Sequence, residues 1–110
     1  MKRSIKSNQR EVEILSFIVS ADGTTVTGLD KNQVSVADTG TGVKTVTIPA
    51  MTSADYSVLV TTATADSVAQ VSVTNSTTFV VNTFDSTDGT TAKDAICHIM
   101  VIGSKVDSRY

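Results

Sequence analysis

The sequence is poor in the side chains that usually carry chemistry. Its 110 residues include one cysteine, one histidine, one proline and no tryptophan. A lone cysteine cannot form an internal disulfide, and a structural zinc needs three or four closely spaced ligands. Cys97 and His98 are adjacent, and adjacent residues of a regular strand point to opposite faces, so they do not form a nucleophile–base pair. No serine-hydrolase elbow and no phosphate-binding loop is present. We expect no enzyme activity, no catalytic residues, no metal and no cofactor.

Long apolar stretches are also missing. No segment approaches the length of a membrane span. The apolar run Ile14–Val19 is shorter than the core of a signal peptide and follows Glu11 and Glu13 directly. We expect a chain made in a reducing cytoplasm that contacts no membrane. At 40% hydrophobic and 18% charged residues the composition excludes a disordered chain, and the length predicts one compact domain.

β-Branched residues are abundant. The chain has 18 threonines and 16 valines, which fit a pleated sheet and are stiff at χ1. Short apolar stretches alternate with turn signals such as Asp22-Gly23 and Asp88-Gly89. They predict seven or eight strands, at Val12–Ser20, Thr24–Gly28, Gln33–Ala37, Val43–Ile48, Tyr56–Thr62, Val68–Thr74, Thr78–Phe84 and Ala95–Ile102.

The expected fold is all-β: a single antiparallel β-sandwich, jelly-roll-like, with an extended N-terminal arm. We place the arm at residues 1–11, the sandwich at 12–103 and a short polar tail at 104–110. No window favours a helix, and the order of the strands stays open because similar short strands permit several arrangements.

Some predicted strands are apolar on both faces, the first and the last above all. A monomeric sandwich has polar residues on its outer face, so strands of this kind indicate association with another subunit or burial within the fold. Because His98 lies in the last apolar strand, we interpret it as a core or subunit-contact residue. The candidates for subunit contact are Ile14, Phe17, Val19, His98 and Met100.

Charge is distributed unevenly. The first ten residues carry four bases and no acid, whereas the rest of the chain has a net charge of −6. A basic arm on an acidic body is typical of an interaction tail. Four bases without aromatic neighbours make a poor nucleic-acid site, and the acidic body would repel a duplex, so we expect no nucleic-acid partner. The candidate contact residues of the arm are Lys2, Arg3, Ile5, Lys6, Arg10 and Val12.

Nine of the eleven acids are aspartates, most of them at predicted turns. Paired carboxylates on β scaffolds can cleave sugars, and aspartate loops can hold calcium. However, the spacing at Asp85–Asp88 matches no EF-hand loop, and aspartate is favoured in turns because its side chain accepts hydrogen bonds from local backbone amides. We therefore interpret these residues as turn residues.

Two segments resemble a pattern found in virion proteins of tailed bacteriophages. The first is Gly40–Pro49, with its Thr-Val-Thr strand, followed by Ala54–Val60, where Ala-Asp-Tyr precedes alternating valines. The second is the closing apolar strand Ile96–Gly103. Lys44 stands where that pattern usually has an aromatic residue. The resemblance covers roughly residues 39–103.

Proteins with this pattern are either head-decoration (cement) proteins or C-terminal domains of tail fibres. The resemblance implies a structural protein on the capsid surface, assembled in the host cytoplasm, with the major capsid protein as partner and a homotrimer as its own assembly. The short arm and the absence of a shaft favour decoration of the head. The alternative is a tail-fibre or receptor-binding module that recognises host surface glycans.

Overall fold

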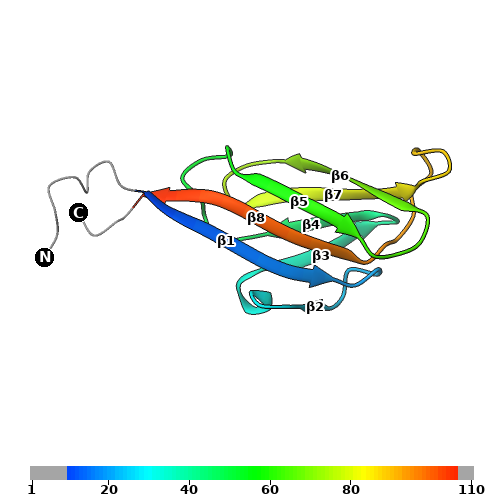
Figure 1. Cartoon of the computed structure of the whole chain (residues 1–110), viewed down its shortest axis with the longest axis horizontal. Coiled ribbons are helices and arrows are strands. Elements are labelled where there is room, and N and C mark those ends of the chain that lie inside the picture. The colour runs from blue at the N-terminus through cyan, green and yellow to red at the C-terminus, as the bar shows by residue number, and fades with distance from the viewer. Residues whose placement is uncertain (1–9, 107–110) are drawn as a thin grey trace, which may run out of the picture.

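A computed structural model describes residues 10–106 as two four-stranded antiparallel sheets that pack face to face (Figure 1). The expected β-sandwich is confirmed. The first sheet has the order β2–β1–β8–β5, formed by β2 (Val26–Thr27), β1 (Arg10–Val19), β8 (Cys97–Val106) and β5 (Ser57–Thr62). The second has the order β3–β4–β7–β6, formed by β3 (Ser35–Gly40), β4 (Val43–Thr47), β7 (Thr78–Asp85) and β6 (Ser67–Val73).

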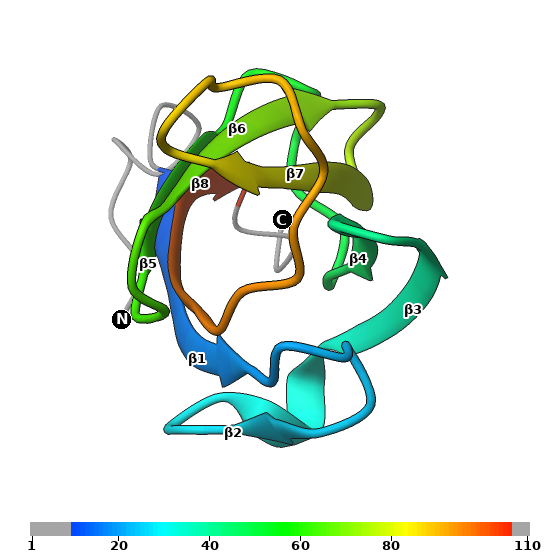
Figure 2. The same ribbon diagram turned by 90° about the vertical axis from the view of Figure 1, so that its right-hand side faces the viewer.

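Strands far apart in the chain are neighbours in the sheets. The first and last strands, β1 and β8, pair over ten positions from Arg10↔Val106 to Val19↔Cys97. In the second sheet β4 pairs with β7. Figure 2 shows that the chain passes from one sheet to the other after β2, and that β5 and β6 close the opposite side of the sandwich.

The observed strands match the eight predicted ones, with differences at their ends. β1 begins at Arg10 instead of Val12, and β8 continues through Gly103 to Val106. The two strands extend each other because each residue added to one finds a partner on the other. The predicted boundaries at residues 11 and 103 therefore fall inside these strands. A single 3₁₀ turn, Lys31–Gln33, is the helical element among residues 10–106.

The core lies between the sheets and is built from alternate residues of each strand, as period-two patterning predicts. Tyr56 and Phe79 meet edge to face, with ring centroids 6.3 Å apart and an interplanar angle of 64°. The Tyr56 hydroxyl reaches the Asn75 and Thr78 carbonyls at 2.9 and 3.0 Å, and burial raises its pKa. The core cluster comprises Leu15, Phe17, Val19, Val46, Ile48, Met51, Tyr56, Phe79, Val81, Cys97, Ile99 and Val101.

Lys44 lies inside this core. The sequence pattern puts it on one face of its strand with Val46 and Ile48, and the structure shows that this face is the buried one. The side chain is 1% exposed, and its Nζ donates a hydrogen bond to the Ala95 carbonyl at 3.3 Å. The body of the sandwich thus encloses a basic group, whose cross-strand neighbours are Asp38 on β3 and Val81 on β7.

Aspartates cap the turns, as expected. The Asp22 carboxylate accepts hydrogen bonds from the Ser20 and Thr24 hydroxyls at 2.7 and 2.8 Å and from the Thr24 amide at 3.1 Å. These bonds lower the pKa of Asp22 to about 2. Gly23 follows in a left-handed conformation with φ 74°, which glycine adopts without strain.

Candidate functional site

The outward side of β5, β8 and β1 forms the most distinctive surface of the molecule, and we name it the outer apolar face. The ladders place its side chains in cross-strand rows: Leu59 lies beside Met100, and Ile14 beside Ile102. Neighbouring residues on the same strands, such as Val58 and Ile99, pack into the core instead. The face consists of Val12, Ile14, Ser16, Ile18, Ser57, Leu59, Thr61, Ile96, His98, Met100 and Ile102.

Large apolar side chains are gathered on this face. Six of the eight exposed large hydrophobic residues that the structure describes belong to it. Exposed apolar residues scattered singly are normal on a protein surface, but a contiguous group marks a contact surface. The six are Val12 at 69% exposure, Ile14 at 55%, Leu59 at 54%, Met100 at 42%, Ile96 at 38% and Ile102 at 37%.

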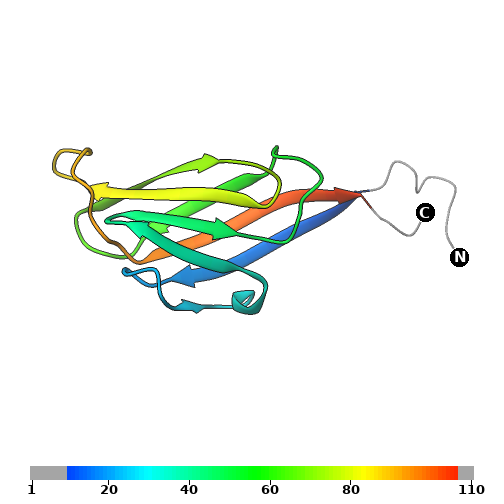
Figure 3. The same cartoon turned by 180° about the vertical axis from the view of Figure 1, so that it is seen from behind.

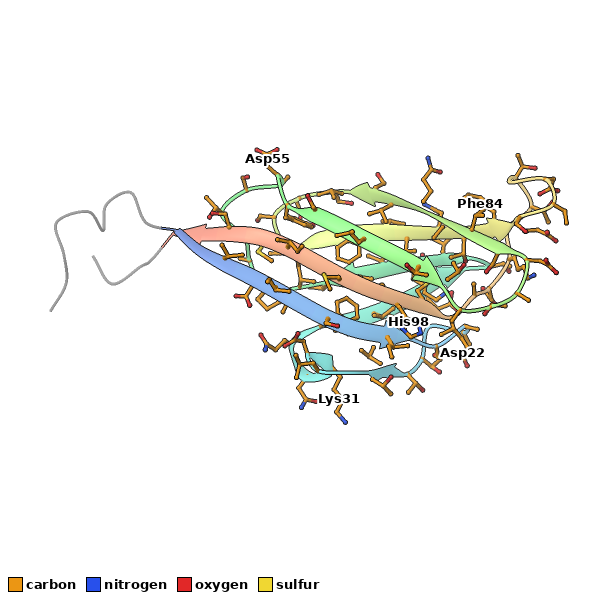
Figure 4. All side chains as sticks on the ribbon, viewed as in Figure 1. Asp22, Lys31, Asp55, Phe84 and His98 are labelled. Carbon is orange, nitrogen blue, oxygen red and sulfur yellow. The ribbon has the colours of Figure 1, made fainter. Side chains whose placement is uncertain are left out.

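His98 is the single ionisable residue of the outer apolar face. It lies in one row with Ile18 and Thr61. Figure 4 shows it at the end of the sheet where the turn that contains Asp22 also lies. An exposed sheet in a monomer usually carries lysine and glutamate. Neither residue occurs at these eleven positions. Covering the face therefore removes little favourable hydration of charged groups.

Two hollows lie along this face. One, of about 370 Å³, is lined by residues of all three strands, including Ser16, Leu59, Thr61, His98 and Met100. The second, of about 450 Å³, shares Ile18 with the first and extends over Ile96 towards the turn between β1 and β2. Both hollows are open to solvent.

The outer face of the second sheet is uncharged as well, but polar. Its outward positions on β4, β6 and β7 are mainly hydroxyl and amide side chains, such as Thr45, Ser72 and Asn82. Val43, Val80 and Phe84 also point outward from this sheet and are half-buried, whereas Val68 on β6 is more exposed, at 43%. The two sheets thus present different surfaces: one apolar, one polar, and both without lysine, arginine, aspartate or glutamate on their outward strand positions among residues 12–104.

Acidic residues collect in the loops at the end of the sandwich opposite the start of β1 and the end of β8 (Figure 3). Hydrogen bonds from the Thr91 hydroxyl and from two amides lower the pKa of Asp88 to about 2, and bonds from Thr87 lower the pKa of Asp85. Lys93 is a base at this end, and its Nζ donates to the carbonyls of Ala65 and Asp66 at 2.8 and 3.2 Å. The acids of this end are Asp22, Asp38, Asp66, Asp85, Asp88 and Asp94.

The structure describes two of the six candidate residues of the arm. Lys2, Arg3, Ile5 and Lys6 lie outside the described residues. Arg10 is the first residue of β1, and Val12 is highly exposed on the outer apolar face. The two described members of the set therefore belong to a strand.

The five candidates for subunit contact divide into two groups. Ile14, His98 and Met100 lie on the outer apolar face. Phe17 and Val19 point the other way and are 1% and 0% exposed in the core, so in this fold they cannot contact another subunit. The reason is strand alternation: a doubly apolar strand gives one set of side chains to the core and the other to the surface.

Sequence reasoning missed Leu59 as a contact residue. It lies between Ser57 and Thr61 on the polar side of an alternating strand, and the signal that marks it is a large apolar residue among small polar ones. Its position beside Met100 depends on the pairing of β5 with β8, which the sequence does not specify.

The side chains with reactive groups do not converge. Cys97 is buried and His98 is exposed on the opposite side of β8, as alternation predicts, and burial raises the pKa of the Cys97 thiol. Among residues 10–106, no group of three or more histidine, cysteine, aspartate and glutamate side chains is placed to hold a metal ion. No described helix has the length and apolarity needed to cross a membrane.

No family model, curated protein or solved structure matches this chain.

Proposed function

We propose that this chain is a structural protein of a tailed-phage particle: a decoration (cement) protein that binds the outside of the head and stabilises the junctions between capsid subunits. Its partners are the major capsid protein and further copies of itself, as a homotrimer, and its location is the capsid surface. The segments that resemble phage virion proteins support the proposal, because each contains a strand of the sandwich. The Thr-Val-Thr motif lies in β4, the alternating valines lie in β5 and the closing apolar motif lies in β8.

The observation that carries the proposal is the outer apolar face. Six exposed apolar side chains do not stabilise a free monomer, because they stay in contact with water. In a protein shell, contact with neighbouring subunits would remove them from water. The uncharged second sheet adds a further surface that loses little solvation when covered. Both features suit a block that packs among other proteins.

The mechanism is binding without catalysis. Area buried across a junction lowers the free energy of the assembled shell, and each copy stabilises the state to which it binds in proportion to its affinity and concentration. The bases of the N-terminal segment, Lys2, Arg3 and Lys6, would pair with acidic groups on the lattice, where an extended segment can also add a strand to an exposed sheet edge.

The test mixes the purified full chain with empty, expanded heads of tailed phages and measures co-sedimentation. We expect stoichiometric saturation and heads that resist heat better after binding. A variant with Lys2, Arg3 and Lys6 changed to glutamine should bind at least tenfold more weakly. Its matched control is Lys31→Gln, which removes one exposed base of the sandwich itself. Heads that bind no chain, with the chain folded, would refute the proposal.

One observation favours the second candidate, a tail-fibre or receptor-binding module. Arg10 and Val106 are paired at one end of the sandwich, so the loops around Asp66 and Asp88 are free at the other end (Figure 1). A fibre tip attached at the first end would present these loops to host glycans. Binding of the chain to host cells or their polysaccharide, with no binding to heads, would support this candidate.

A further inference from the structure

We propose that the outer apolar face is the surface through which copies of this chain contact one another, with Leu59, Met100 and Ile14 covered by a second copy. The inference deepens the proposed function, on which it rests for the expected number of three copies. The contact itself is argued from this face.

The first argument is charge. Residues 11–110 carry a net charge of −6, and the loop carboxylates, Asp22 and Asp88 among them, are ionised at neutral pH. Two identical copies therefore repel each other through any contact that brings these loops together. None of the eleven residues of the outer apolar face is a lysine, arginine, aspartate or glutamate, and His98 is its one ionisable residue. Two copies that meet away from the Asp22 turn therefore oppose few like charges. The same neutrality would give a strongly charged foreign partner nothing to pair with.

The second argument is the choice between two neutral faces. The outer face of the second sheet is also uncharged, but its hydroxyl and amide groups are hydrated, and covering them requires new hydrogen bonds. The outer apolar face instead removes six apolar side chains from water, which is favourable at about 25 cal/mol for each Å² buried. Self-association is therefore assigned to the first sheet.

The third argument is the backbone at the edge of β1. The short strand β2 pairs only with Ile18 and Val19. The Ser16 amide and carbonyl point away from β8 and bind Asp30 at 2.7 and 3.0 Å. Two and four residues earlier, Ile14 and Val12 direct their backbone groups the same way, and no described strand pairs with them there. An exposed apolar edge of this kind is a template for association, and it borders the outer apolar face.

The size of the face sets the strength of the contact. Three strands span about 14 Å, and nine residues along β1 span roughly 30 Å, so the footprint is on the order of 400 Å² for each copy. A stable interface buries about 800 Å² for each partner. We therefore expect an assembly that dissociates on dilution.

The experiment is sedimentation equilibrium of the full chain over a range of concentrations, with circular dichroism to verify folding. The wild type should reach a multiple of its 11.5 kDa mass, three being the expected number. Met100→Lys and Leu59→Lys should each weaken association at least tenfold, because a lysine ammonium would be desolvated in the contact. The matched control is Val68→Lys on the second sheet, since Val68 is 43% exposed and Met100 is 42%. The control should associate as the wild type does.

A wild type that remains monomeric at every concentration would overturn the proposal, as would equal weakening by Val68→Lys and Met100→Lys. A folded Leu59→Lys that associates normally would also overturn it. Head binding, measured separately, distinguishes this inference from the proposed function. Copies that associate through the face but bind no head refute the function alone, and a monomer that saturates heads refutes the interface alone.

Discussion

Replacement of Lys44 by methionine is expected to stabilise the fold. Lys44 is 1% exposed. Its ammonium group has three N–H donors, and among the described residues one acceptor, the Ala95 carbonyl at 3.3 Å, receives a hydrogen bond from it. Burying an ionised group with few partners is unfavourable, and replacing buried ionic groups by apolar ones of similar volume is often neutral or stabilising by about 1–4 kcal/mol. Methionine has a similar length and fills irregular space.

The loss of one hydrogen bond offsets part of this gain, by about 1 kcal/mol. We therefore expect Lys44→Met to raise the free energy of unfolding by about 2 kcal/mol, which corresponds to roughly 8–12 °C in Tm for a domain of this size. The measurement is urea unfolding followed by circular dichroism. Lys44→Ala is the control: it removes the charge but leaves a cavity, and it should be less stable than the methionine variant. A methionine variant that is less stable than the wild type by more than about 1 kcal/mol would refute the reasoning.

Three further changes test particular contacts. Gly42→Ala should destabilise the fold by about 3 kcal/mol, because φ is +69° and the new Cβ would lie 2.5 Å from a carbonyl oxygen. Its control is Gly89→Ala, at φ +70° with open space around it, which should lower the free energy of unfolding by only about 1 kcal/mol. Equal losses of the two variants in urea unfolding would contradict this reasoning. Tyr56→Phe should lower the free energy of unfolding by about 1 kcal/mol, because the hydroxyl donates its single proton to a site shared by two backbone carbonyls. An unchanged Tm in thermal unfolding would contradict this. Asp88→Asn tests acid stability. The Thr91 hydroxyl and neighbouring amides lower the pKa of Asp88 to about 2, below the unfolded value of about 3.9, so its contribution is present above pH 4 and is lost as the pH falls towards 2. Acid unfolding of the asparagine variant should show a smaller loss across this interval, and an unchanged profile would count against the role of this carboxylate.

Local features of the fold were accessible from the sequence. Seven or eight strands were expected and eight are present, each within or overlapping a segment named from the sequence, and Asp22-Gly23 and Asp88-Gly89 are turns in the structure. These signals are local, because a strand and a turn depend on the residues within them. The opposite orientation of Cys97 and His98 followed from the same period of two.

The arrangement of the strands was not accessible. The neighbours of β8 are β1 and β5, which come from distant parts of the chain, and no pattern within a strand specifies its partner. For the same reason the sequence could not show which candidates on β1 face the core and which face outward. Ile14 and Phe17 are both large and apolar, and the position of the second sheet decides which of them is covered. Leu59 was missed because its importance comes from Met100 on the neighbouring strand.

The pairing of the first strand with the last has a mechanical consequence. A tension applied between residues 10 and 106 acts at one end of the β1–β8 ladder, because these two residues are partners. Such a pull separates the ladder pair by pair, so each step breaks few bonds, whereas a shearing load would have to break many at once. The sandwich is consequently expected to open at low force when it is stretched between residues 10 and 106.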